Sequence, residues 1–403
     1  MSKYNYDSKA LKGLGVGPFL NEVKTRDAEI AKGENTIPTS IYNPNIISEK
    51  LHPSIQFGII NKVIEHKGAK TYVIGPNKNK GTEKLAYFRA GQYVSIVIEP
   101  NNGAFLTRPY SLCSNPKDVF KGIYEITIKG INDGYASTYI LENWKEGTEV
   151  TLSGPLGQFY YERLRDAKNV VALAGGSGIT PFLSMARAIA DKTEDFNLTI
   201  LYGSRTYENI LLKDELEKAE NESNGKVKVF HVLSDEEKEG FEHGFISAEL
   251  IKKYAKDDYS IFICGPKAMY KFLETELVKL NLPRRRIRQE LAGEYGDPTS
   301  DENYPKENAN KEYKLKVWVR GEAHELTCKS ESTLMRAIEQ AGIKVTTDCR
   351  SGICGWCHSR LIKGDIYIPE GHDGRRLADK KFGWIHPCAT YPLSDIEMEV
   401  FPN

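Results

Sequence analysis

The stretch Asp348-Cys349-Arg350-Ser351-Gly352-Ile353-Cys354-Gly355-Trp356-Cys357 has three cysteines at Cys-x4-Cys-x2-Cys spacing, and a fourth, Cys388, follows farther along the chain. Four thiolates in this order are the ligand pattern of a [2Fe–2S] cluster. Gly352 and Gly355 allow the backbone to approach closely and take positive φ at little cost. The exposed N–H groups then find acceptors in the sulfur atoms. The pattern therefore predicts a metal site made by Cys349, Cys354, Cys357 and Cys388.

A structural zinc site and a pair of disulfides are the two alternatives for these cysteines. Structural zinc usually shows two short Cys pairs, and the four-residue gap does not suit that pattern. Seven cysteines with four in one cluster motif indicate a reducing compartment, most simply the cytoplasm. The other three, Cys113, Cys264 and Cys328, are dispersed, and we expect them to be unpaired.

The overall composition narrows the class of protein. A chain of 403 residues suggests about two to four domains. With 40% hydrophobic residues, 27% charged residues and a net charge of zero, it has a globular balance and no electrostatic case for nucleic acid or an anionic membrane. No apolar run approaches the roughly eighteen residues of a membrane span. The first residues also lack the apolar core of a signal peptide.

Residues 1–52 are predicted to form an N-terminal extension, because they are polar and show no clear period. The extension is interpreted either as a strap or partly disordered segment, or as a partner-docking segment. Residues 53–162 contain short β-branched and aromatic runs at 56–60, 70–74, 92–98 and 124–128, separated by turn residues. This texture predicts a small antiparallel β-barrel.

Residues 163–292 change to buried apolar strands that alternate with helices, at 170–174, 198–202, 227–233 and 260–263. This alternation predicts an α/β domain with a parallel, doubly wound sheet. Residues 293–312 have the composition of a linker. In residues 313–403, two strands join at Arg320-Gly321 and a short helix with Leu334 and Ile338 precedes the cysteines, so we expect an α+β fold of the β-grasp type.

Five short motifs could hold phosphates and flat rings. Arg108-Pro109-Tyr110-Ser111 offers a phosphate donor, an aromatic face and a hydroxyl. Lys129 and the glycine turn with Gly134, Ser137 and Thr138 open a predicted helix, whose N–H groups would meet a phosphate. After the first parallel strand comes Gly175-Gly176-Ser177-Gly178-Ile179-Thr180-Pro181, where Thr180 is the expected N-cap and Pro181 the first helical residue. The other two motifs are Ser204-Arg205 and Cys264-Gly265-Pro266 with Met269.

Three of these motifs, in this order, resemble the ferredoxin–NADP reductase superfamily: Arg108 to Ser111, Gly175 to Pro181, and Cys264-Gly265-Pro266 with Met269. Residues 313–403 resemble ferredoxins of the plant type. The layout is similar to that of phthalate dioxygenase reductase and of phenylacetyl-CoA epoxidase reductase. The resemblance implies an NAD(P)H-dependent oxidoreductase that carries a flavin and passes electrons singly through the cluster to a partner protein. It implies that Arg108 contacts the flavin phosphate, Tyr110 stacks on the ring, and Ser111 and Cys264 are the catalytic positions near the flavin and the nicotinamide.

Several alternatives stay open from the sequence. The partner is either an oxygenase or an oxygen-independent reductase or other metalloenzyme, as in an anaerobe. A non-enzymatic redox sensor is the competing class of function, although the flavin and nucleotide motifs are intact. Arg205 could bind the 2′-phosphate of NADPH, yet similar turns occur with NADH. FAD is expected over FMN, because Gly154 to Phe159 and the loop from Lys129 to Ser137 resemble the epoxidase-reductase type.

Overall fold

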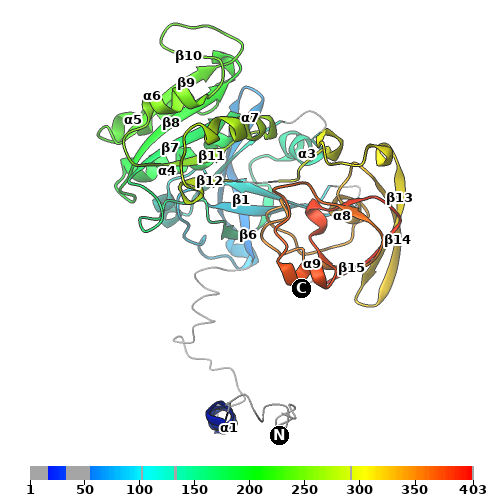
Figure 1. Ribbon diagram of the computed structural model, residues 1–403. Coiled ribbons are helices and arrows are strands. Elements are labelled where there is room, and N and C mark those ends of the chain that lie inside the picture. The colour runs from blue at the N-terminus through cyan, green and yellow to red at the C-terminus, as the bar shows by residue number, and fades with distance from the viewer. Residues whose placement is uncertain (1–16, 33–54, 101–102, 131–133, 291–292, 402–403) are drawn as a thin grey trace. The chain divides into compact units, whose positions relative to one another are not determined.

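The computed structural model describes residues 17–32, 55–100, 103–130, 134–290 and 293–401 (Figure 1). The chain forms two compact units, residues 1–50 and residues 51–403. In the first unit the structure describes one helix, α1 (Gly17–Lys32). The sequence predicted no regular element there, because the segment is polar and lacks a clear period. The rest of the predicted extension lies outside the described residues.

A closed antiparallel sheet begins the second unit. Its strands, in the spatial order β4-β3-β6-β1-β2-β5, are β1 (Gln56–His66), β2 (Ala69–Pro76), β3 (Tyr93–Ile98), β4 (Leu106–Ser111), β5 (Tyr124–Lys129) and β6 (Glu149–Leu156). A bridge between Leu112 and Ile126 joins the two outer strands, so the sheet closes into the predicted barrel. Its interior is apolar: Val150 and Leu152 of β6 are buried, while Glu149 and Thr151 between and beside them are not. Helix α3 (Tyr135–Asn143) follows β5.

A parallel sheet forms the next part of the unit, in the order β10-β9-β8-β7-β11-β12. Its strands are β7 (Asn169–Gly175), β8 (Asn197–Ser204), β9 (Val227–Leu233), β10 (Glu242–His243), β11 (Tyr259–Cys264) and β12 (Ile287–Gln289). Its helices are α4 (Thr180–Ala190), α5 (Lys213–Glu222), α6 (Ala248–Tyr254) and α7 (Lys267–Val278). This is the predicted α/β architecture.

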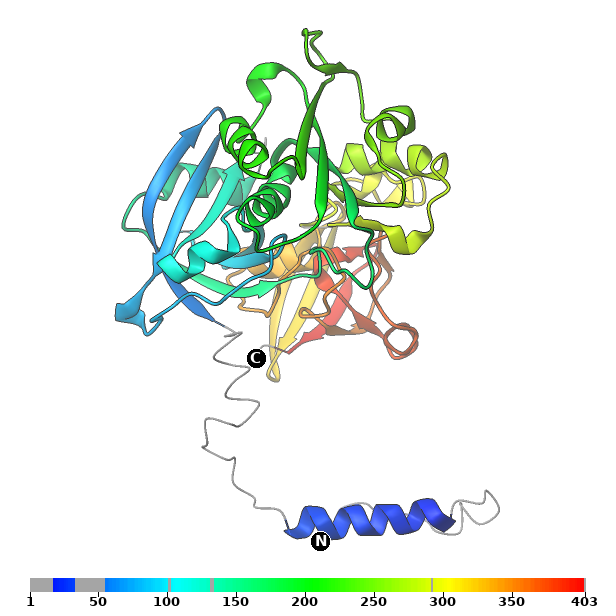
Figure 2. The same cartoon turned by 90° about the vertical axis from the view of Figure 1, so that its left-hand side faces the viewer.

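Both faces of this sheet are covered by helices. Val170 and Ala172 of β7 pack in one hydrophobic cluster with residues of α4 and α5. Val171 and Leu173, which point the other way, pack with residues of α6 and α7. Figure 2 shows the two groups of helices on opposite sides of the green strands. In the parallel register Ala174 lies opposite Cys264, and Gly175 lies opposite Gly203. The loops after β7, β8 and β11 therefore meet at one edge, where such sheets bind ligands.

The C-terminal part is a mixed sheet with the order β14-β13-β19-β15-β17 and a separate pair, β16 with β18. Its elements are β13 (Glu312–Val319), β14 (Glu322–Lys329), α8 (Leu334–Gln340), β15 (Ser359–Lys363), β16 (Ile366–Tyr367), α9 (Leu377–Lys381), β17 (Trp384–Ile385), β18 (Tyr391–Pro392) and β19 (Ile396–Val400). The turn between β13 and β14 has φ of 50° at Arg320 and 87° at Gly321, which suits a two-residue hairpin. The parallel pairing of β13 with β19 places the last strand beside the first.

Residues 293–312, whose composition predicts a linker, pack against the C-terminal part. Tyr304 is only 2% exposed, and its ring meets Tyr367 edge-on at 5.2 Å. Tyr391 donates a hydrogen bond of 2.9 Å to the carbonyl of Gly296. Asn308 donates one of 2.7 Å to the carbonyl of Leu393. This segment is therefore fixed along the C-terminal domain and is not a free tether. Residues 293–312 are called the strap below.

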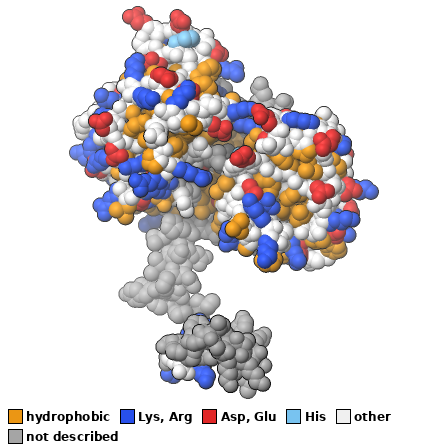
Figure 3. Space-filling view, viewed as in Figure 1, with side chains coloured by type: hydrophobic (Ala, Val, Ile, Leu, Met, Phe, Trp, Pro, Cys, Tyr) orange, Lys and Arg blue, Asp and Glu red, His pale blue; other side chains and the backbone are white. Residues whose placement is uncertain are grey.

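The surface carries both signs of charge. On the face in Figure 3, Lys and Arg are interspersed with Asp and Glu, and no area of a single sign dominates. Of the helices in the described part of the chain, not one has the length and apolar character that crossing a bilayer requires.

Candidate active site

One large cavity, of about 1440 Å³, lies where the barrel, the parallel sheet and the C-terminal part come together. Eighteen of the predicted cofactor residues line it: Arg108, Pro109, Tyr110, Ser111, Lys129, Gly134, Ser137, Gly175, Gly176, Ser177, Gly178, Thr180, Ser204, Arg205, Cys264, Gly265, Pro266 and Met269. The other two do not line it. Thr138 has an exposed side chain on α3, and Pro181 is buried inside α4. Motifs that are far apart in sequence thus share one space.

Strand β4 carries the Arg108 to Ser111 motif along the barrel side of the cavity. Tyr110 packs partly against the barrel core, and burial raises the pKa of its phenol above the usual range. Its flat ring lines the cavity. The guanidinium of Arg108 also contacts the C-terminal domain, because its Nη1 lies 3.1 Å from a carboxylate oxygen of Glu339.

The glycine turn before α3 forms the next wall. Ser137, in the first turn of α3, donates a hydrogen bond of 3.1 Å to the carbonyl of Gly134. A Cβ added at Gly176 would lie 3.9 Å from Nζ of Lys129. Lys129 therefore reaches from the barrel to the nucleotide loop, where it can serve an anionic group held between the two motifs.

The nucleotide loop and the Cys264 turn touch each other so closely that they require glycine. A Cβ at Gly178 would lie 2.1 Å from the carbonyl oxygen of Cys264. One at Gly175 would lie 2.7 Å from the sulfur of Met269. Glycine at these two positions therefore allows the loop to pack directly on the Cys264 turn. The two loops together line the cavity at the start of α4, where helix N–H groups can meet a phosphate.

The prediction that Thr180 is the N-cap of this helix is wrong. A 3₁₀ turn, Gly176–Ile179, precedes α4, so Thr180 is the first α-helical residue and Pro181 the second. The Oγ1 of Thr180 donates a hydrogen bond of 3.0 Å to the carbonyl of Ser177. The hydroxyl therefore stabilises the 3₁₀ turn instead of accepting from the helix N–H groups.

Cys264 and Glu290 line the part of the cavity at the ends of β11 and β12. Cys264 is half-buried, and burial raises the pKa of its thiol, so it stays protonated at neutral pH. Glu290 was not among the residues that the sequence predicted. Burial raises the pKa of its carboxyl to about 8. The hydroxyl of Tyr270 donates a 2.6 Å hydrogen bond to the backbone carbonyl of Glu290, which holds the backbone of Glu290 in place. A signal existed, namely a carboxyl directly after a parallel strand, but β12 has only three residues.

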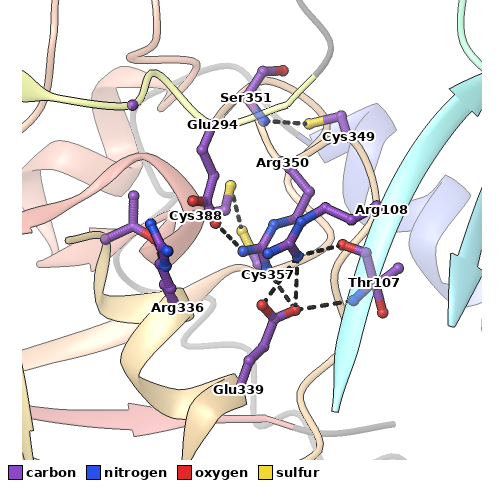
Figure 4. Close-up of polar contacts among 12 residues, drawn as sticks. Thr107, Arg108, Glu294, Arg336, Glu339, Cys349, Arg350, Ser351, Cys357 and Cys388 are labelled. Atoms are coloured by element: carbon purple, nitrogen blue, oxygen red, sulfur yellow. Dashed lines mark hydrogen bonds and ion pairs between the residues drawn. The ribbon is translucent and has the colours of Figure 1, made fainter. Parts of the chain in front are cut away.

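The four predicted metal ligands form two pairs. Sγ of Cys357 lies 3.3 Å from Sγ of Cys388 (Figure 4). Cys349 accepts hydrogen bonds from the thiol of Cys354 and from the backbone N–H of Ser351 and Cys354, and these bonds lower the pKa of Cys349. Among the described residues no three His, Cys, Asp or Glu side chains gather around one point as a single-ion site would require. Two pairs of thiols, one pair for each iron, suit a [2Fe–2S] cluster. The donor set therefore fits such a cluster better than it fits zinc.

The loop that holds these thiols depends on a left-handed backbone. Gly352 has φ of 79°, and a Cβ there would lie 2.2 Å from the carbonyl oxygen of His372. Arg350 has φ of 60°, which is uncommon for a residue with a side chain. Its side chain shows what holds it there, because the guanidinium is fully buried between two carboxylates.

The carboxylates around Arg350 come from α8 and from the strap. Nη1 of Arg350 lies 2.9 Å from Glu339, and Nη2 contacts Glu294. Glu339 also accepts a hydrogen bond of 3.1 Å from the backbone N–H of Thr107. Figure 4 shows the carboxylate of Glu339 bonded to both arginines, Arg108 from the barrel and Arg350 from the cysteine loop. The cysteine loop is thus tied to the wall of the cavity.

Three family models match the chain, each on a different part. Residues 77–161 match the oxidoreductase FAD-binding domain, residues 172–275 the oxidoreductase NAD-binding domain, and residues 317–393 the 2Fe-2S iron-sulfur cluster binding domain. These matches agree with the barrel, the parallel sheet and the cysteine loop.

Relatives align with most of the chain. The glycine betaine monooxygenase reductase subunit of Chromohalobacter salexigens is 26% identical over 78% of this chain and 88% of its own length. The ferredoxin reductase component of 3-ketosteroid-9-alpha-monooxygenase from Rhodococcus rhodochrous is 25% identical over 83% and 94%. Among solved structures, phthalate dioxygenase reductase is similar in fold, with a TM-score of 0.62 and 22% identity over 86% of this chain and 98% of that one.

Proposed function

Since the chain belongs to the iron–sulfur flavoprotein reductases of the ferredoxin–NADP reductase superfamily, we propose that it takes electrons from NAD(P)H and delivers them singly to a partner protein. One observation carries this proposal. The flavin motif, the nucleotide loop and the strap beside the cysteine loop all line a single cavity. The N–H of Gly293, which lines this cavity, donates a 3.1 Å hydrogen bond to the carbonyl of Cys349, so the backbone of the cysteine loop lies next to the cavity wall.

The residues of the barrel would hold FAD. When bound, FAD supplies a centre that accepts a hydride and releases electrons one at a time. Arg108 and Lys129 offer positive charge for its phosphates, and the turn with Gly134 and Ser137 offers backbone N–H groups. Tyr110 offers a neutral ring face and Ser111 a hydroxyl for the ring edge.

The residues of the parallel sheet would hold NAD(P)H. Gly175 to Thr180 would bind its pyrophosphate at the start of α4, and Ser204 with Arg205 its ribose. Gly265, Pro266 and Met269 shape the wall beside Cys264. The thiol of Cys264 and the carboxyl of Glu290, whose pKa values are both raised by burial, line the same cavity. Their role is to position the nicotinamide and exclude water.

Cys349, Cys354, Cys357 and Cys388 would hold the cluster through which electrons leave. The relatives above are, by name, reductase components of monooxygenases. On that basis we propose an oxygenase component as the acceptor. All seven cysteines are free in the structure, which supports a reducing compartment such as the cytoplasm.

Anaerobic mixing of the full chain, loaded with FAD and cluster, with NADH or NADPH tests the proposal. The absorbance of the flavin should fall first and that of the cluster should follow, and ferricyanide and cytochrome c should then both be reduced. A flavin that stays oxidised with both nucleotides would reject the enzyme in favour of a cluster-based sensor.

A further inference from the structure

The residue directly before the first cysteine, Asp348, has its side chain inside the interface with the barrel. It is only 3% exposed. One of its carboxylate oxygens accepts a 3.1 Å hydrogen bond from the hydroxyl of Tyr93, and the other accepts one from the hydroxyl of Ser95. The Ser95 hydroxyl also lies 3.4 Å from the backbone carbonyl of Asp348. Tyr93 and Ser95 both belong to β3, more than two hundred residues earlier in the chain.

This buried contact is energetically demanding. Burying a carboxylate without partners costs several kcal/mol, and hydrogen bonds to a charged group are the stronger kind. The two hydroxyls offset this cost only if the cysteine loop lies at one position on β3. The contact therefore selects one seating of the loop, as polar groups in an apolar surround often do.

The same strand pair also fixes the flavin motif. In the antiparallel register of β3 with β4, Tyr93 lies opposite Ser111 and Ser95 lies opposite Pro109. The two residues that hold the cysteine loop are thus the direct cross-strand neighbours of the motif that lines the cavity. No turn or loop intervenes between them, so the distance from the motif to the cysteine loop is set by one pair of strands.

We propose that Tyr93 and Ser95 are positioning residues for electron transfer, which seat the cysteine loop on β3 at a fixed distance from the flavin site. This inference rests on the proposed function. It separates two tasks of the interface. The ion pairs of Glu339 with Arg108 and Arg350 hold the C-terminal domain in place. The two hydroxyls instead set the first part of the loop, at Asp348 and the adjoining ligand Cys349.

The test uses the full chain with the double substitution Tyr93→Phe and Ser95→Ala, which removes both hydroxyls and leaves the cysteine loop itself unchanged. Neither residue lines the cavity, so reduction of the flavin by NADH should keep its rate. Subsequent reduction of the cluster, followed by stopped-flow absorbance without oxygen, should slow about tenfold, the equivalent of about 1.4 kcal/mol. Hydrogen exchange at the amides of residues 348–357 should become faster.

Two measurements distinguish a loss of positioning from a loss of cofactor or a change in the cluster. Iron and flavin content, and the EPR spectrum of the cluster after dithionite reduction, should match the unsubstituted protein. Tyr87→Phe, which removes an exposed tyrosine hydroxyl from the same barrel, should change none of the rates. If the double variant loses cluster, the single variants Tyr93→Phe and Ser95→Ala carry the test, and each should slow cluster reduction by part of the total.

An unchanged rate of cluster reduction in variants with full cofactor content would overturn the proposal. A failure of the proposed function looks different, because the unsubstituted protein would then show no transfer from flavin to cluster. Loss of flavin reduction in the double variant would also reject the positioning role, since it would place the two residues in the flavin site.

Discussion

The guanidinium of Arg108 on β4 and the carboxylate of Glu339 on α8 form an ion pair of 3.1 Å between the flavin motif and the C-terminal domain. Glu339 is almost fully buried, and it also binds Arg350, whose side chain has no exposed surface. The pair thus belongs to a chain of alternating charges that continues to Glu294 on the strap. Breaking such a buried network leaves an uncompensated charge, which is costly.

Glu339→Gln should therefore destabilise the C-terminal domain. Gln keeps the shape and one hydrogen bond, but it leaves buried Arg350 with a single carboxylate partner. We expect the free energy of unfolding to fall by about 3 kcal/mol, near the lower end of the range for a broken buried ion pair. The measurement is the temperature at which the visible absorbance of the cluster disappears.

Glu325→Gln is the matched control for this change, because Glu325 is exposed on β14 of the same domain. It should change the free energy of unfolding by no more than about 0.5 kcal/mol. Equal transitions for the Glu339 and Glu325 variants would show that the buried network adds nothing to stability.

The features that sequence reasoning predicted are those whose signal is local. The cysteine spacing, the glycine loop after β7 and the turn at Arg320-Gly321 each lie within about ten residues, and each dictates a backbone shape directly. The parallel sheet was also predictable, because strands buried on both faces are continuous apolar runs. The position of Thr180 was mistaken because a 3₁₀ turn, a frequent feature of α-helix N-termini, precedes the α-helix here.

The features that sequence reasoning missed depend on distant partners. Arg108 and Glu339 are 231 positions apart, and Ser95 and Asp348 are 253 apart. A lone glutamate or aspartate in an amphipathic segment gives no sign that it is buried until the fold brings its partner near. The packing of Tyr304 was hidden in the same way, because the strap has the polar composition of a free linker.

The choice between the two nicotinamide nucleotides can be tested at Arg205, which lines the cavity after β8. If it binds the 2′-phosphate, Arg205→Ala removes a charge-assisted hydrogen bond of about 1.5–3 kcal/mol. The KM for NADPH should then rise about tenfold or more, while the KM for NADH stays nearly constant. Arg163→Ala, at an exposed arginine outside the cavity lining, is the control. Equal changes for both nucleotides would reject selection by Arg205.

The acid sensitivity of the parallel-sheet domain should depend on His231. Its ring centroid lies 5.7 Å from that of Tyr202 and 5.8 Å from that of Phe241, and burial lowers its pKa to about 4. The unfolded chain, with a pKa of about 6.5, binds the proton more readily, so stability is lost as the pH falls from about 6.5 towards 4. Between pH 7 and pH 5 this amounts to at most about 2 kcal/mol.

His231→Phe keeps an aromatic ring and removes the titrating group. Urea unfolding of the variant, followed by circular dichroism, should therefore lose less stability between pH 7 and pH 5 than the unsubstituted protein does. His243→Phe, at an exposed histidine on β10, should leave the pH dependence as it is. Parallel pH profiles for all three proteins would contradict a buried, neutral His231.

The last prediction concerns the division of labour between flavin and cluster. Cys354 is the exposed member of the four thiols, and it bonds Cys349 through its thiol and its N–H. Cys354→Ser should lose or weaken the cluster, since serine is a harder ligand and a poorer match for iron and sulfide. The cavity residues from Arg108 to Met269 are untouched, so NAD(P)H should still reduce the flavin and ferricyanide should still accept its electrons. Transfer to cytochrome c or to the oxygenase should fall to background.

Tyr110→Ala provides the opposite case, because it removes the ring face of the flavin motif while all four thiols remain. It should weaken flavin binding and stop both activities, whereas Cys328→Ser, at a buried thiol outside the cluster loop, should leave the cluster spectrum in place. The order nucleotide, flavin, cluster, partner requires these three different outcomes. It would be wrong if Cys354→Ser abolished ferricyanide reduction while the flavin stayed bound, because electrons would then have to reach even a small acceptor through the cluster.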